Sequence, residues 1–356
     1  MLHARLFFAA LVACGCAQTS SRTSSTDAHH SKTLAHALEF SGMCDASAAI
    51  PLSRSLFIAV SDEDNVLRLY DADRPGPPLR ELDFSAALGL VKPTRSDPLR
   101  AEESDLEAAT RVGDLAFFVT SHGRSSSGKF KSARLRFFAT TTPPDGAATL
   151  VGQPYERLLD DLLAEPSLAA FGLRAAAELP PKARGGLNLE GMTARPEGGV
   201  LLGFRNPIPN GRALLVPLEN PSELIRGNAN ARFGAPITLD LDGLGVRGLS
   251  HHRDRYLIEA GHFDRGGASS LFVWDGPGQS PVRVQQLDLS DFNPEGFFTP
   301  ENRDEILLLS DDGTRTTDGV ECKRLRDPAA RTFRGLWLTL PRQSSAAPAK
   351  DPRMGK

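Results

Sequence analysis

Acidic side chains recur in this chain directly before glycine or alanine, each at the head of a short apolar segment. Three copies carry glutamate, in Glu107-Ala108, Glu190-Gly191 and Glu295-Gly296. About fifteen positions after each such residue, a second apolar segment ends on another polar side chain. Antiparallel pairing of the two segments would bring both polar positions to one end of a hairpin. The candidate polar set is Glu107, Glu190, Glu295, Asp62, His122, Arg205, His262, Asp311 and Asp312.

Several carboxylates at one opening repel one another unless a cation offsets their charge. Ca²⁺ takes about six to eight oxygen ligands and would offset several of them at once. We therefore predict calcium as the cofactor, with metal ligands Glu107, Glu190, Glu295, Asp62 and Asp311. Further ligand-binding oxygens are expected from Asn188, Asn206, Asn293 and Asp312. The predicted catalytic residues are Arg205 and, as general base near its natural pKa, His122 or His262.

Two other interpretations of these acids stay open. A repeated acid can hydrogen-bond the backbone of a neighbouring repeat, with Arg205 and Arg247 pairing with glutamates in the absence of a metal. A metal-free pair of catalytic carboxylates is the third possibility. Ser47 and Arg247 replace glutamate in the two remaining copies. A working site on a repeat scaffold needs such broken symmetry, although drift produces the same pattern.

The repeat itself predicts the architecture. Its key positions are 47, 107, 190, 247 and 295, and a spacing of roughly 50 to 80 residues suits four-stranded propeller blades better than helical solenoids. Third strands are predicted at 65–71, 133–140, 213–220, 270–276 and 335–341, and outer strands at 79–85, 237–243 and 284–291. The sequence thus predicts an all-β fold, a β-propeller of five four-stranded blades, with a degenerate sixth blade left open.

The last blade lacks an outer strand, because no strand pattern follows residue 340. Residues 36–42 match the outer strands of the other blades and lead directly into the first repeat. We expect this N-terminal strand to complete the C-terminal blade, so that the ring closes without an open sheet edge. Helical patterns at 155–164 and 168–179 predict a small helical insertion, about 154–180, in a propeller domain spanning 34–341.

The N-terminus carries export signals. Residues 1–13 have the shape of a signal peptide, with Arg5 before a short apolar run. The junction at residues 11–14 resembles the lipobox of bacterial lipoproteins, which implies lipidation of Cys14. An ordinary cleaved signal is the alternative. Because Gly15 rather than aspartate follows Cys14, the lipoprotein interpretation implies export to the cell envelope and anchoring at the outer membrane. The composition predicts a flexible tether at residues 14–33 and a disordered tail at 342–356.

Two cysteines remain in the folded part, Cys44 and Cys322. An exported chain can oxidise them, and the blades that carry them are neighbours in a closed ring. We predict a disulfide between them, with two separate buried thiols as the alternative. A formal net charge of −3 favours neither nucleic acid nor an acidic surface as partner. We expect a monomer that meets the membrane only through its lipid anchor.

Four segments make a family resemblance specific: LEGMTARPEGGVLLGFRNPIPNGRALLVPL, DLEAATRVGDLAFFVTSHGR, SDEDNVLRLYD and LLLSDDGTRTTDGVECKR. They resemble the bacterial domain-of-unknown-function family 3616 over about residues 42–340, a family without an established activity. The Glu-Gly pairs are distantly similar to the calcium-binding propellers of the gluconolactonase and paraoxonase group and of the esterase-like phytase group. In those propellers such a glutamate faces the central channel.

We therefore expect an envelope propeller that hydrolyses an ester, lactone or phosphoester with the help of calcium. The alternative is a non-catalytic module that binds a small molecule, a glycan, a peptide or a partner protein, with structural carboxylates in its channel.

Overall fold

The computed structural model describes residues 37–264, 266–285, 287, 289, 291–300 and 303–339. The chain divides into two units, Met1–His36 and Ala37–Lys356, and the fold described here belongs to the second. The predicted signal peptide, the tether with Cys14 and the predicted C-terminal tail lie outside the described residues.

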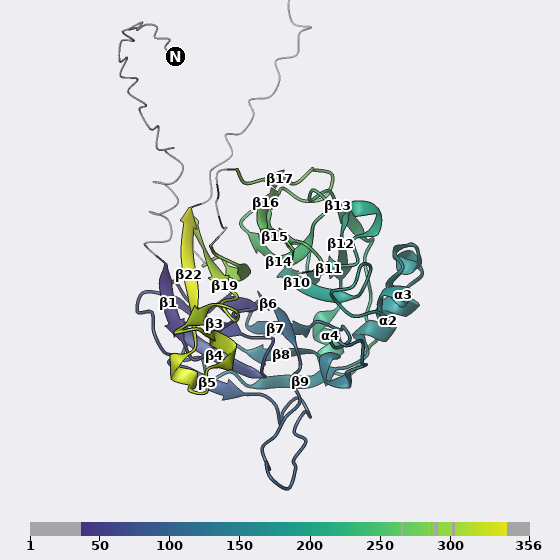
Figure 1. Cartoon of the computed structure of the whole chain (residues 1–356). Helices are drawn as coiled ribbons and strands as arrows, with labels where there is room; N and C mark the ends of the chain where they lie inside the picture. The colour runs from purple at the N-terminus through teal and green to yellow at the C-terminus, as the bar shows by residue number, and fades with distance from the viewer. Residues whose placement is uncertain are drawn as a thin grey trace, which may run out of the picture. The chain divides into compact units, whose positions relative to one another are not determined.

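Short apolar runs bounded by turn residues form five four-stranded antiparallel sheets, arranged as the blades of a propeller (Figure 1). The first blade contains β2 (Ala48–Pro51), β3 (Leu56–Val60), β4 (Val66–Asp71) and β5 (Arg80–Asp83). The second contains β6 (Leu106–Val112), β7 (Leu115–Thr120), β8 (Phe137–Thr141) and β9 (Leu150–Tyr155). The third contains β10 (Asn188–Ala194), β11 (Val200–Asn206), β12 (Ala213–Leu218) and β13 (Ile237–Leu239). The fourth contains β14 (Gly245–His252), β15 (Arg255–Gly261), β16 (Ser270–Trp274) and β17 (Val282–Arg283).

The fifth blade joins the two ends of the described chain. It contains β18 (Pro294–Phe298), β19 (Glu305–Ser310), β22 (Thr332–Thr339) and β1 (Leu38–Ser41). β1 pairs antiparallel with β22, with Leu38 opposite Gly335 and Ser41 opposite Thr332. The innermost strands β2, β6, β10, β14 and β18 contact one another in this cyclic order, and β18 contacts β2. The predicted five blades and their closure by an N-terminal strand are therefore confirmed.

Aromatic packing holds the closing strand in place. Phe40 of β1 is fully buried and lies within 5.5 Å, centroid to centroid, of Phe57, Tyr70 and Phe333. Full burial of a phenylalanine side chain stabilises a fold by about 1.5 to 3 kcal/mol. This contact links the fifth blade to the first through their cores.

Helices are short and lie mainly between the second and third blades. They are α2 (Leu158–Ala164), the 3₁₀ helix η2 (Pro166–Phe171) and α3 (Leu173–Ala176), followed later by α4 (Pro221–Ile225). Leucines of α2, η2 and α3 pack into the apolar core shared by the second and third blades. The predicted helical insertion is thus present. No helix among the described residues is long and apolar enough to cross a membrane.

The remaining short elements are a two-stranded hairpin and four 3₁₀ helices. The hairpin pairs β20 (Thr316–Thr317) with β21 (Val320–Glu321). The 3₁₀ helices are η1 (Ser132–Arg134), η3 (Pro209–Gly211), η4 (Cys322–Arg324) and η5 (Pro328–Ala330).

Two outer strands differ from expectation. β9 has no counterpart in the prediction, because Gly152 and Pro154 interrupt its pattern; Gly152 has a left-handed backbone (φ 68°). The predicted helix from 155 begins only at Leu158, since Tyr155 still belongs to β9. The fourth blade's outer strand is β17 at Val282–Arg283 rather than 284–291. Both residues of β17 are exposed, so no apolar alternation marks it.

Candidate functional site

Beta-bulges turn one polar residue toward the propeller axis in four of the five innermost strands. The register of the inner hairpins shifts between Leu106 and Ala108, Leu189 and Gly191, Val246 and Gly248, and Pro294 and Gly296. The extra residues are therefore Glu107, Glu190, Arg247 and Glu295. A bulge re-aims the side chain of its extra residue. In the first blade the equivalent Ser47 lies just ahead of β2.

The small residue that follows each bulge leaves room for the next blade. A Cβ atom on Gly191 would lie 2.6 Å from Val246 Cγ1, and one on Gly296 would lie 2.4 Å from the carbonyl oxygen of Ala46. Both contacts are closer than real Cβ atoms show. The Glu-Gly pairs therefore encode two features at once, an axial carboxylate and close packing of neighbouring inner strands.

A cavity of about 430 Å³ opens at the end of the axis where these strands begin; we call it the axial cavity. Its lining includes Asp45, Asp62, Lys182, Arg205, Arg247, His262, Asn293, Glu295, Asp311 and Lys323. A much smaller space of about 20 Å³ follows along the axis, lined by Glu107, Glu190 and Glu295 together with apolar residues such as Met192 and Phe297. The predicted convergence of polar residues at one axial opening is thus present for most of them.

On one side of the axis, arginines neutralise the glutamates; we call Glu190, Arg205, Arg247 and Glu295 the arginine side. Arg205 Nη1 lies 2.9 Å from Glu190 Oε1, and Arg247 Nη2 lies 2.7 Å from Glu295 Oε1. Burial by itself would raise the pKa of Glu295, but Arg247 and Arg205 hold it below its usual value. The opposing carboxylates, Glu295 first, hold the pKa of Arg247 above its usual value despite its burial.

The opposite side of the axis carries acids without such partners; we call Asp45, Asp62, Glu107 and Asp311 the acidic side. No lysine or arginine of the described chain forms an ion pair with any of these four carboxylates. Burial raises the pKa of Asp45 and Glu107 well above the usual range, and nearby carboxylates add to this effect. Burial and the charge of Glu295 raise the pKa of Asp62 to about 8 and that of Asp311 to about 6.

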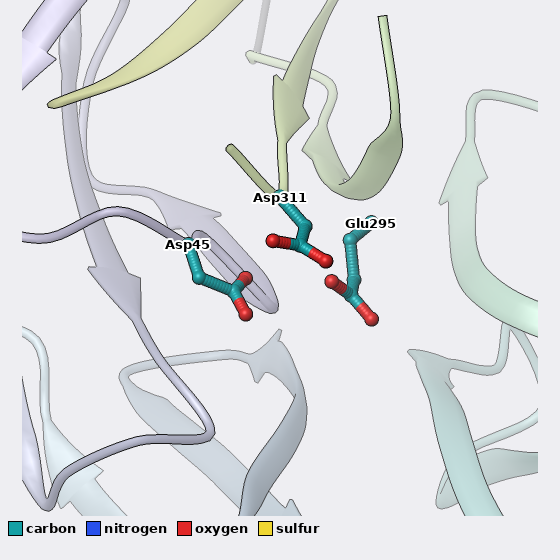
Figure 2. A group of neighbouring side chains, drawn as sticks. All are labelled: Asp45, Glu295 and Asp311. Atoms are coloured by element: carbon teal, nitrogen blue, oxygen red, sulfur yellow. The ribbon is translucent and has the colours of Figure 1, made fainter. Parts of the chain in front are cut away.

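Three carboxylates meet where the two sides join. Figure 2 shows Asp45, Glu295 and Asp311 directed toward a common space, and each offers an oxygen within 4.8 Å of the others. Two further groups satisfy the same criterion, namely Asp62 with Asp105 and Glu107, and Glu107 with Glu190 and Glu295.

The donor chemistry at this junction fits a hard cation. The three groups consist of carboxylates alone, which are the ligands that Ca²⁺ prefers. Buried oxygens without a hydrogen-bond donor, Asp62 Oδ1 and Glu295 Oε2, also remain. Buried polar atoms without partners cost stability, so a cation that these oxygens coordinate would stabilise the fold.

The cluster of Asp45, Glu295 and Asp311 lies at the seam where the first and fifth blades meet and the ring closes. Asp45 and Asp311 form an isolated antiparallel bridge between the first and fifth blades, and the backbone N–H of Asp312 donates to the carbonyl of Cys44 at 2.8 Å. The Cys44–Cys322 disulfide spans the same seam, which confirms the predicted pairing. Asp312 itself accepts hydrogen bonds from Arg334 and Ser310, so it fastens the fifth blade internally.

Several other predicted site residues lie in the wall of the cavity or away from it. His122 is buried, its Nδ1 donates to the carbonyl of Thr120 at 2.8 Å, and burial lowers its pKa to about 4. It does not line the axial cavity, and its pKa is not the natural one expected. His262 does line the cavity and is exposed, so the general-base hypothesis rests on this residue.

The three asparagines predicted as ligands form hydrogen bonds with other residues of the protein. Asn188 donates to Glu190 Oε1 at 2.6 Å, and Asn293 donates to Asp311 and accepts from Arg247. Asn206 is fully buried and donates to the carbonyls of Pro181 and Ala183. Arg205, predicted as catalytic, donates to Glu190 and to the carbonyls of His262 and Asp264.

Sequence reasoning missed Asp45, Asp105, Lys182 and Lys323. Asp45 and Asp105 had a signal, because each stands two positions before the key residue of its repeat. Asn188 and Asn293, which the sequence analysis chose as oxygen donors, occupy the same position in two other repeats. The two lysines lie in segments outside the repeat, and nothing in their local sequence marks them.

Several solved structures are distantly similar to this chain. The chain is similar to a PQQ-bound aldose sugar dehydrogenase of Streptomyces coelicolor, with 10% identity, 84% of this chain and 96% of that chain covered, and a TM-score of 0.42. It is also similar to a glutaminyl cyclase of Myxococcus xanthus, with 10% identity, 85% and 95% covered, and a TM-score of 0.43. Neither likeness assigns an activity to this chain. A search of curated proteins found no match. Residues 139–292 match the model of the family described as "Protein of unknown function (DUF3616)", which confirms over this segment the family that the sequence motifs resemble.

Proposed function

We propose that this protein binds a divalent cation, calcium, in its axial cavity and hydrolyses an ester, lactone or phosphoester there. The observation that carries the proposal is the convergence of Asp45, Glu295 and Asp311 at the seam, where no ion pair with another described residue offsets Asp45 or Asp311. Burial disfavours charge on these carboxylates, and a bound cation would relieve that cost.

Asp45, Asp311 and Glu295 would hold the cation, and Asp62 lines the same cavity. When bound, the cation would act as a Lewis acid toward the reacting oxygen of the substrate. His262 lies on the exposed part of the lining and would accept a proton from the attacking water. Arg205 donates to the backbone carbonyl of His262 at 2.7 Å and so holds the backbone of this residue in place.

We propose further that the protein is exported and anchored by lipid to the bacterial envelope, at the outer membrane. The Cys44–Cys322 disulfide supports export, because such bonds persist in oxidising compartments. Metabolic labelling with a palmitate analogue in a bacterial host would test whether Cys14 carries the lipid anchor.

A non-catalytic binding module is the second candidate, and the arginine side favours it. Glu190 and Glu295 are paired with Arg205 and Arg247, so in this half of the channel the carboxylates already have structural partners. The cavity would then recognise a small molecule or a glycan without turnover.

Elemental analysis of the full-length protein, with melting curves in calcium and in chelator, tests the first proposal. We expect one or more calcium ions per chain and a melting temperature that falls on chelation. Asp45→Asn and Asp311→Asn should lose the metal, whereas Asp160→Asn, an exposed position in α2, should keep it. Absence of calcium together with unchanged melting would refute the cation site.

Activity is tested separately on a panel of ester, lactone and phosphoester substrates. We expect turnover that chelation abolishes and that His262→Asn reduces about 100-fold or more, as loss of a general base does. Calcium binding without turnover of any substrate class would favour the non-catalytic module.

A further inference from the structure

Two lysines line the axial cavity together with its carboxylates. Lys182 belongs to the loop that follows the helical insertion, and Lys323 belongs to η4 of the fifth blade. Neither forms an ion pair or a side-chain hydrogen bond with another described residue. Cations that line a cavity without partners of their own are available to a ligand.

The backbone that carries Lys182 is held from inside the protein. Asn206 is 1% exposed, and its side-chain amide donates to the carbonyls of Pro181 at 2.8 Å and Ala183 at 2.7 Å, one on either side of Lys182. Gly186 closes the loop, because a Cβ there would lie 2.1 Å from the carbonyl oxygen of Pro180. A buried side chain thus fixes the backbone position of an exposed cation.

Lys323 is held just as firmly. It follows Cys322 of the disulfide, and its backbone N–H donates to the carbonyl of Gly313, which itself lines the cavity. The two lysines therefore come from separate, anchored segments rather than from one mobile loop.

The arginines of the cavity cannot take this role. Arg205 donates to Glu190 and to two carbonyls, and Arg247 is paired with Glu295 and donates to Ser269 and Asn293. The terminal nitrogens of both guanidinium groups already have partners within the protein, and Arg247 Nε is buried, so an incoming anion would meet the lysines.

Charge balance links these lysines to the cation. The full lining carries six carboxylate and four lysine or arginine side chains, a formal excess of two negative charges. A divalent cation would offset this excess. Without the cation the excess of acidic groups disfavours an anion in the cavity.

We propose that Lys182 and Lys323 form an anion subsite, so that the ligand of this cavity carries a phosphate or carboxylate group beside the bound cation. The inference deepens the proposed function and rests on its cation site. A cavity of about 430 Å³ has the size of a small-molecule pocket. Lysine binds phosphate as a point charge, and Asn206 is a positioning residue that acts through the Lys182 loop.

Calorimetric titration of the full-length protein with inorganic phosphate tests the subsite, in dilute calcium and in chelator. We expect phosphate to bind the calcium-loaded protein at least about tenfold more tightly than the chelated protein, by linkage between the two ions. Lys182→Met and Lys323→Met should each weaken phosphate binding by about tenfold or more, the effect of losing one charge-assisted hydrogen bond. Lys92→Met, at an exposed position outside the cavity, should not change it.

Calcium stoichiometry, measured on the same variants, separates this inference from the proposed function. Full calcium content with phosphate binding that neither lysine variant alters would overturn the anion subsite and leave the cation site standing. Failure of the native protein to bind calcium would overturn the proposed function and, with it, the expected coupling. Parallel titrations with acetate and malonate distinguish a carboxylate ligand from a phosphate ligand.

Discussion

Removing the Cys44–Cys322 disulfide should lower both the stability of the propeller and its affinity for calcium. The bond joins residues 278 positions apart, so it constrains nearly the whole folded chain. The chain-entropy model gives about 5.5 kcal/mol for a loop of this length, as an upper value. Unfolding entropy of roughly 2.1 cal/mol/K per residue gives about 0.6 kcal/mol/K for about 300 folded residues. The expected fall in melting temperature is therefore about 9 °C.

The same bond should matter for the site because its cysteines adjoin cavity residues. Cys44 precedes Asp45, and Cys322 precedes Lys323. The Asp45–Asp311 bridge and the hydrogen bond from Asp312 to Cys44 depend on the same seam. Without the crosslink, calcium must order the seam as it binds, so its affinity should fall.

The assay compares the native protein with the double variant Cys44→Ala, Cys322→Ala, which avoids burying new hydroxyl groups. Thermal melts and calcium titrations are recorded with and without reductant, and reductant should affect only the native protein. A fall in melting temperature below about 2 °C would refute the closure argument, because pairing of β1 with β22 would then suffice. Unchanged calcium affinity in the double variant would refute the link between closure and site.

Two further predictions concern the charges around the axis. The pKa of Asp62 is raised to about 8 and those of Asp105 and Asp311 to about 6, so the folded, calcium-free protein binds more protons than the unfolded chain between about pH 4 and 8. The stability of the calcium-free protein should therefore fall as pH rises through this window. Calcium should raise the melting temperature more at pH 8 than at pH 5. A chelated protein that is more stable at pH 8 than at pH 5 would contradict this. Arg247→Met leaves Glu295 buried without its partner and should cost about 3 to 5 kcal/mol in urea unfolding, whereas a loss below about 1 kcal/mol would show that the pair is dispensable.

Much of the architecture could be predicted because local patterns of apolar and turn residues determine it. Inner and third strands have apolar runs that must pack between blades, and those patterns survive in each repeat. The outer strands β9 and β17 could not be located in this way. Gly152 and Pro154 break the pattern of β9, and β17 is short and exposed, so backbone pairing with a neighbour decides these strands.

The repeat also identified the axial positions, because a bulge followed by a small residue leaves a sequence signature. This signature alone identified Glu107, Glu190 and Glu295 and predicted that they lie close together on the axis. It could not predict which of these glutamates pair with an arginine. Whether a glutamate meets an arginine or another acid depends on which blades become neighbours across the axis.

From the sequence by itself came the propeller, its five blades, its closure by an N-terminal strand and the cysteine pair, since each follows from spacing and from the period of apolar residues. Only the tertiary structure decided the division of the channel into an arginine side and an acidic side. It also decided that Asp45 and Asp311 meet at the seam and that Lys182 and Lys323 reach the same cavity. The physical reason is that electrostatic partners are set by proximity in space, and ring closure brings together residues that are more than two hundred positions apart.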